Sequence, residues 1–243
     1  MTRITVRDEG EVRWIGLNRP EKRNAIDMAT ADELIAALDQ ARKTPCVLIV
    51  HSATPGIFAA GADIAELRDR DADAALLAIN AGVFERLEAH RWPAIAVVDG
   101  PALGGGCELA LACDFRIASH NAYFAQPELS LGILAGAGGN WRLAQTAGQQ
   151  VARRMLYAGA RLTAADALAA GLVDEVADDP DAAARALAAK ITRQSWRALE
   201  LTKLALRSHR PATTTFDMAA QALLFESQEK HDRMTAFLNR RRP

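Results

Sequence analysis

Three consecutive glycines followed by a glutamate form the most chemically suggestive stretch of this chain. Gly104, Gly105 and Gly106 lack a Cβ atom, so the backbone there can bend sharply and approach a ligand closely. An apolar run over residues 107–113 follows directly and contains one carboxylate, Glu108. If this run is a helix, its first amides face whatever lies over the glycines and favour negative charge. The stretch therefore predicts an anion-binding backbone with an acid or base beside it.

Glu108 allows two interpretations. A lone glutamate on a helix usually lies at the solvated surface. Here Leu111 and Ala112, about one turn away, are apolar, as are the flanking residues, and a helix that is apolar on all sides is buried. A buried carboxylate is costly unless it has a partner or a task. We therefore favour a functional role for Glu108.

A second glutamate, Glu128, lies in a Gln-Pro-Glu turn after a predicted strand, before another glycine-rich stretch at 136–139. On its own such a turn is commonplace. Two glutamates in one pocket, however, can divide the chemistry, because one can activate a water molecule while the other delivers or accepts a proton. Glu108 and Glu128 together thus indicate acid–base catalysis.

A third segment, residues 58–64, leads from a predicted strand into a helix through small residues. Asp63 suits the N-cap or first turn of that helix, where its carboxylate can accept amide hydrogen bonds. The segment is either a tight turn without a ligand or a turn that presents the backbone amide of Ala62 to one. Its own sequence leaves both interpretations open.

The elements that must position these segments alternate between strands and helices. The predicted elements before residue 140 are strands at 4–7, 12–18, 46–50, 94–98, 115–118 and 122–124, with helices at 27–44 and 72–91. After it we predict helices near 148–158, 163–170, 181–193, 195–208 and 213–238. Buried strands alternating with helices indicate an α/β domain with a helical C-terminal layer.

Composition excludes several classes of function. A formal net charge of −1 gives no field that would attract nucleic acid or an anionic membrane. No apolar run approaches the ~20 residues that span a bilayer, and the N-terminus lacks the apolar core of a signal peptide, so we expect a cytoplasmic protein. The three cysteines are an odd number in apolar surroundings, which indicates reduced core residues. The five histidines show no zinc spacing, so we expect no metal.

Together these segments resemble the crotonase superfamily, the enoyl-CoA hydratase/isomerase group, over nearly the whole chain. The matching stretches are Leu17–Pro20 with Asn24-Ala25, Phe58–Ile64, Asp99–Ala110, Gln126–Glu128, Gly136–Gly139, Arg142-Leu143, Ala170–Val173 and Met234–Phe237. The resemblance implies a ClpP-like α/β spiral of ββα units over residues 1–190. It also implies a helical oligomerisation region over 191–243, assembled as a homotrimer or as a homohexamer formed by a dimer of trimers.

The resemblance further implies an acyl-CoA thioester as substrate, with no separate cofactor because coenzyme A is part of that substrate. Its thioester oxygen would lie between the amides of Ala62 and Gly105, Glu108 would orient or deprotonate a water molecule, and Glu128 would serve the proton at the α-carbon. The residues implied to lie along coenzyme A are Lys22, Arg23, Ala60, Gly61, Asp63, Ile64, Gly104, Phe237 and Arg240.

Within the family, glutamate at both positions favours a 2-enoyl-CoA hydratase. The alternatives are a Δ3,Δ2-enoyl-CoA isomerase or another acyl-CoA enzyme of this type, and a non-catalytic acyl-CoA-binding protein. Ala135 and Asn140-Trp141 depart from the proline and Thr-Gln of many hydratases. Because the loop after Glu128 lines the acyl side of the pocket in the family, we expect Trp141 to affect chain-length preference.

Overall fold

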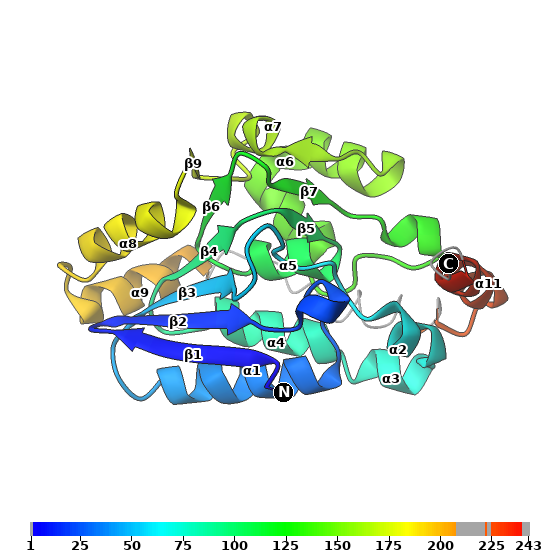
Figure 1. The fold of residues 1–243 in the computed structure, drawn as a ribbon, viewed down its shortest axis with the longest axis horizontal. Coiled ribbons are helices and arrows are strands. Elements are labelled where there is room, and N and C mark those ends of the chain that lie inside the picture. The colour runs from blue at the N-terminus through cyan, green and yellow to red at the C-terminus, as the bar shows by residue number, and fades with distance from the viewer. Residues whose placement is uncertain (1, 208–221, 223–224, 240–243) are drawn as a thin grey trace.

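Two β-sheets form the centre of the molecule in the computed structural model, which describes residues 2–207, 222 and 225–239 (Figure 1). The larger sheet contains, in spatial order, β1 (Ile4–Glu9), β2 (Val12–Leu17), β3 (Val47–Ser52), β4 (Ala94–Val98), β6 (Phe115–Ser119) and β9 (Glu175–Ala177). The smaller sheet contains β5 (Pro101–Leu103), β7 (Tyr123–Ala125) and β8 (Leu162–Thr163). Every pairing in the larger sheet is parallel except the β1–β2 hairpin.

Helices cover both faces of the larger sheet, which explains why β4 and the first four residues of β3 are all apolar. Leu48 and Val50 of β3 face the core shared with α1 (Met28–Ala41) and α4 (Ile79–Glu88). Val47 and Ile49, which point the other way, pack against α8 (Pro180–Ile191) and α9 (Trp196–Arg207). The sheet is thereby held between two apolar layers.

The smaller sheet positions the two glutamate-bearing segments. β5 leads into α5 (Gly105–Leu111), and β7 leads into the 3₁₀ helix η2 (Glu128–Leu131). Because β5 and β7 are parallel neighbours, their carboxyl ends lie side by side, and the amide of Gly104 donates to the carbonyl of Ala125 at 2.9 Å. Segments distant in sequence therefore meet at one edge.

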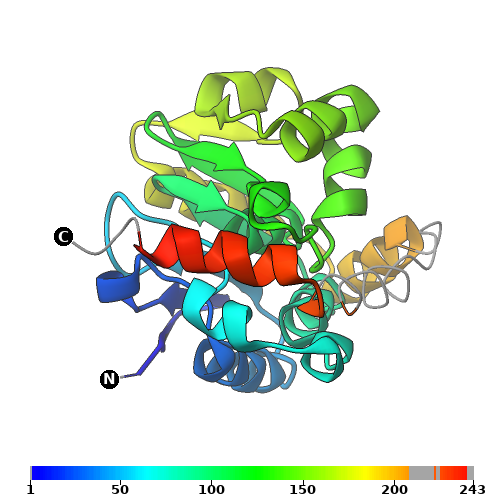
Figure 2. The ribbon, with the colours of Figure 1, turned by 90° about the vertical axis from the view of Figure 1, so that its right-hand side faces the viewer.

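The remaining helices with described bounds lie around the two sheets (Figure 1). They are the 3₁₀ helix η1 (Pro20–Lys22), α2 (Ile64–Asp69), α3 (Ala72–Leu76), α6 (Gly139–Ala158), α7 (Ala164–Ala169) and α11 (Gln228–Asn239). Figure 2 shows α11 lying across α2, and α11 also contacts η2. The buried ammonium of Lys230 fastens α11 there, because its Nζ donates to the carbonyls of Arg68 and Arg70 at 2.9 and 2.8 Å.

The structure confirms the α/β architecture and corrects some predicted elements. The helix expected over 72–91 is divided into α3 and α4 at Ala78, which has φ of 48°. The short strands β5, β8 and β9 were not predicted. The helix α6 begins at Gly139, nine residues before the expected 148, and Gly148 within it has a non-helical φ of 80°. Of the helix expected over 213–238, residues 213–221, 223 and 224 lie outside the described residues, and the rest is interrupted at 226–227 before α11 begins at Gln228. In the described part of the chain, no helix is long and apolar enough to cross a membrane.

Candidate active site

A cavity open to solvent lies where α2, α5, η2 and the start of α4 meet. The structure brings to its wall eight residues that the sequence predicts for the site, namely Ala60, Gly61, Ala62, Ile64, Gly104, Gly105, Glu108 and Glu128. The remaining wall is mostly apolar and includes Leu67, Leu131 and Phe225. Two carboxyl groups therefore face an otherwise largely apolar space.

The backbone amides of Ala62 and Gly105 lie close together at this wall. A Cβ atom added to Gly105 would lie only 3.4 Å from the nitrogen of Ala62. Ile26 fixes the first segment, because its amide donates to the Gly61 carbonyl at 2.7 Å and its carbonyl accepts from Asp63 at 3.2 Å. Gly61 and Asp63 both bond to Ile26, so the amide of Ala62 between them points away from Ile26. Within the described residues, neither the Ala62 amide nor the Gly105 amide has a protein acceptor.

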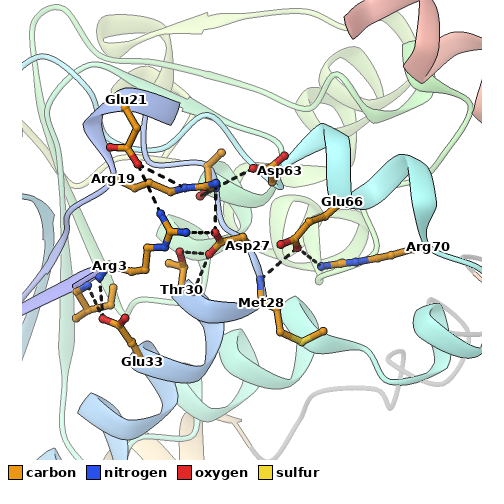
Figure 3. Close-up of polar contacts among 12 residues, drawn as sticks. Arg3, Arg19, Glu21, Asp27, Met28, Thr30, Glu33, Asp63, Glu66 and Arg70 are labelled. Atoms are coloured by element: carbon orange, nitrogen blue, oxygen red, sulfur yellow. Dashed lines mark hydrogen bonds and ion pairs between the residues drawn. The ribbon is translucent and has the colours of Figure 1, made fainter. Parts of the chain in front are cut away.

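Asp63 begins α2 and is tied into an ion-pair cluster (Figure 3). Its carboxylate accepts from the amide of Ala65 at 3.0 Å and pairs with Arg19 Nη1 at 2.9 Å. Arg19 also pairs with Asp27, the N-cap of α1, at 3.2 Å. Asp63 thus fixes the start of α2 beside Ala62, as its N-cap pattern predicts, and it does not line the cavity.

Glu108 is buried, and two backbone amides hold its side chain. Its Oε1 accepts hydrogen bonds from Ala137 and Gly139, both at 2.8 Å. Arg142 fixes the loop that supplies these amides, because its Nη1 donates to the Ala137 carbonyl at 2.7 Å and its Nη2 pairs with Glu88 at 2.8 Å. Hydrogen bonds to the charged form favour an ionised Glu108.

Glu128 is also buried, and its surroundings disfavour the charged form. Burial, together with the nearby charge of Glu108, raises the pKa of the Glu128 carboxyl well above its usual 4.5. The amide group of Gln126 lies 3.1 Å from both carboxyl oxygens and helps to position the Glu128 side chain. The pair can therefore hold one proton on Glu128 and a negative charge on Glu108.

Other predicted residues lie away from the cavity wall. Lys22 and Arg23 are exposed beside it, and the Arg23 carbonyl accepts from Ala60 at 3.0 Å. Arg240 lies outside the described residues. Phe237 of α11 packs against an apolar cluster made of Leu67, Ala75, Leu131, Ile133, Phe225 and Met234. Trp141 does not line this cavity either, because its ring packs under the Arg142 guanidinium, 4.2 Å away.

Sequence reasoning missed several residues of the site. Arg70 and Asn80 line the cavity, and Gln126 and Arg142 support the two glutamates. The Gln-Pro-Glu and Arg-Leu motifs contained the last two without indicating what they do. No pattern in the sequence marks Arg70 or Asn80, because only the folding of α3 and α4 over the cavity brings them to its wall.

The fold and the site define an α/β protein with a buried carboxyl pair facing two amides without protein acceptors. The chain belongs to the enoyl-CoA hydratase/isomerase family, whose model matches residues 7–243. It is 37% identical over 250 residues to the 2,3-dehydroadipyl-CoA hydratase of Escherichia coli, covering 100% of this chain and 98% of that protein. It is 34% identical to the short-chain-enoyl-CoA hydratase of Clostridium acetobutylicum, with 100% and 97% covered.

Solved structures agree with this assignment. The crystal structure of an enoyl-CoA hydratase/isomerase from Mycobacterium paratuberculosis superimposes with a TM-score of 0.89 at 30% identity, covering 97% of this chain and 98% of that one. The enoyl-CoA hydratase of Bacillus anthracis gives a TM-score of 0.81 at 32% identity, covering 99% and 98%. The chain therefore has the crotonase fold, with sheets built from ββα units and C-terminal helices.

Proposed function

We propose that this protein is a 2-enoyl-CoA hydratase, which adds water across the 2,3 double bond of an enoyl-CoA to give a 3-hydroxyacyl-CoA. The observation that carries the proposal is the carboxyl pair, in which Glu108 is held by two amides at 2.8 Å while Glu128 has a raised pKa. An ionised and a protonated carboxyl group in one cavity are what the addition of water requires. The names of the hydratase relatives point the same way.

The proposed reaction begins with the thioester oxygen between the amides of Ala62 and Gly105. As Glu108 accepts a proton from water, the water oxygen bonds to C3 and the π electrons move toward the thioester. The two amides stabilise the resulting enolate-like charge, at about 3–4 kcal/mol for each donor. Glu128 then gives its proton to C2. The product thus gains a hydroxyl group at C3 and a proton at C2, which together make up one water molecule. Transfer of the proton from Glu108 to Glu128 then restores the initial protonation states of the two carboxyl groups.

The direct test is the absorbance of the conjugated thioester of crotonyl-CoA and of longer enoyl-CoAs. We expect the absorbance to fall as water is added, and folded protein that hydrates no chain length would refute the proposal. Incubation with a 3-enoyl-CoA tests the isomerase alternative, since an isomerase would convert it to the 2-enoyl form.

Glu128→Gln is the matched variant for this mechanism. It keeps the shape and the neutral state of the side chain but cannot donate the proton. We expect kcat to fall by about 10²–10⁴-fold with acyl-CoA affinity nearly unchanged. Equal activity would remove Glu128 from the mechanism, whereas tight acyl-CoA binding without turnover by the unaltered protein would favour the non-catalytic alternative.

A further inference from the structure

One wall of the cavity presents groups that favour an anion. Arg70 directly follows α2, and Asn80 lies in the first turn of α4. Both line the cavity that also contains Glu108 and Glu128. The proposed hydration assigns no task to either side chain.

The guanidinium of Arg70 has few protein partners for its position. Its side chain is only 14% exposed, and it has five N–H donors. Within the described residues its one acceptor is Glu66, at 3.4 Å (Figure 3). Glu66 is itself 42% exposed, so solvent weakens this ion pair. Most donors of a largely buried cation are therefore available to a ligand.

Asn80 offers a second polar group with no protein partner in the described part of the chain. Its Oδ1 is completely buried without a hydrogen bond, although buried polar atoms are normally paired. Because this oxygen is the end of the carboxamide that is shut off from solvent, the NH₂ group is the end that can face the cavity and donate to an anion. The start of α4 adds to this, because its N-cap, Ala78, provides no side-chain hydrogen bond and residues 78–81 line the cavity. The positive end of the helix dipole thus faces the same space.

An acyl-CoA has two possible sources of such an anion, the phosphates of coenzyme A and a carboxylate on the acyl chain. The phosphates are separated from the thioester by the long pantetheine arm. Arg70, in contrast, shares one cavity with the reacting carboxyl groups, and the six residues of α2 that separate it from the Ala62 turn span only about 9 Å. Leu67, Leu131 and Phe225 provide an apolar wall suited to the methylene groups between.

We infer that the cavity accepts an enoyl-CoA whose acyl chain ends in a carboxylate, with Arg70 as the counter-ion and Asn80 as a hydrogen-bond donor. This inference rests on the proposed function for the orientation of the substrate. It adds a substrate class, the CoA thioesters of dicarboxylic acids, and two residues that determine specificity.

Equilibrium binding of adipyl-CoA and hexanoyl-CoA, measured by calorimetry, tests the inference without turnover. The two ligands have the same chain length and differ in the terminal carboxylate. We expect the unaltered protein to bind adipyl-CoA at least about tenfold more tightly, as one charge-assisted hydrogen bond would provide. Arg70→Met should abolish this preference and leave hexanoyl-CoA affinity unchanged. Arg68→Met, which removes a neighbouring arginine that does not line the cavity, should preserve the preference.

Two results would overturn the inference. One is that the unaltered protein binds hexanoyl-CoA as tightly as adipyl-CoA or more tightly. This result can be interpreted without any variant. The other is an equal loss of both affinities in Arg70→Met, which would assign Arg70 to the phosphates or to the fold. Asn80→Ala keeps Arg70 in place. It should weaken the binding of adipyl-CoA but not that of hexanoyl-CoA, and it provides a second test if Arg70→Met does not fold. Crotonyl-CoA hydration in parallel shows separately whether the proposed function itself fails.

Discussion

Gly105 and Gly106 are neighbours at the start of α5, but the structure gives a side chain at each position a different consequence. A Cβ at Gly105 would make only ordinary contacts, the nearest at 3.4 Å from the Ala62 nitrogen. It would, however, stand where the thioester oxygen is proposed to bind. We therefore expect Gly105→Ala to fold normally while kcat/KM falls by about 10²–10³-fold. Hydration kinetics and a thermal melt of the same sample measure both effects.

Gly106→Ala is the matched control. There the Cβ would overlap the carbonyl oxygen of Ala59, which is backbone and cannot move aside easily. We expect a loss of about 1–3 kcal/mol in the free energy of unfolding from this overpacking. If Gly105→Ala were as destabilised as Gly106→Ala, or fully active, Gly105 would have no special place in the site.

The raised pKa of Glu128 makes stability depend on pH. Its unfolded pKa is near 4.5 and its folded pKa is well above that value, because the folded carboxyl is desolvated and lies near Glu108. Between the two values the folded state binds a proton that the unfolded state lacks. Stability from this group is therefore present below pH 4.5 and is lost as pH rises through the folded pKa.

Glu128→Gln removes this titration. We expect the free energy of unfolding of the variant, relative to the unaltered protein, to increase steadily from about pH 5 toward alkaline pH. Urea denaturation at several pH values measures the difference. Parallel curves for the two proteins would show that Glu128 titrates normally.

At the scale of elements, the loop before α6 and the helix α4 are joined through Arg142. This buried guanidinium connects the Ala137 carbonyl to Glu88. We expect Arg142→Met to cost about 3 kcal/mol of unfolding free energy, because it removes the buried cation of this ion pair. It should also lower kcat, since the amides that hold Glu108 lose their support. Urea denaturation and steady-state kinetics measure the two effects.

Glu88→Gln provides the comparison. In a double-mutant cycle with Arg142→Met, coupled residues give a non-additive loss of about 0.5–3 kcal/mol. Strict additivity, or full activity in Arg142→Met, would contradict the proposed connection between α4 and the Glu108 loop.

Predictability from sequence also differs between elements. The long apolar runs that became β3 and β4 were predicted correctly, because burial on both faces leaves a clear pattern. The strand β9 has only three residues at an edge and was missed. The break at Ala78 carries no glycine or proline, so no local signal announces it.

The candidate site shows the same limit. Burial of Glu108 could be predicted because its neighbours in sequence are apolar, and all of α5 is indeed buried. The contacts that distinguish the two glutamates come from residues far away in sequence, such as Ala137 and Gly139 for Glu108. Arg70 is likewise brought to the cavity by tertiary packing alone. Patterns in a single sequence indicate which residues are near each other along the chain. The contacts of Glu108 and the position of Arg70 depend instead on residues that only the folded chain brings together.

For the whole molecule, the two helices with described bounds that begin after residue 190, α9 and α11, have different roles. α11 folds back onto α2 and η2 of its own chain. α9 instead packs one face against the large sheet and leaves leucines uncovered on another, with Leu201 50% and Leu204 61% exposed. These residues are three positions apart and so share one face of the helix. We expect this face to bury itself against other copies of the chain, as trimers or hexamers.

Substitution of Leu201 and Leu204 by aspartate tests this assembly. The carboxylates are tolerated on an exposed face of a single chain but are costly inside an apolar interface. We expect size-exclusion chromatography with light scattering to show a trimer or hexamer for the unaltered protein and a smaller species for the double variant. Leu168→Asp on α7, where one leucine is 44% exposed, serves as the control and should not change the mass. A monomeric unaltered protein, or an unchanged mass in the double variant, would show that this face of α9 is not the interface.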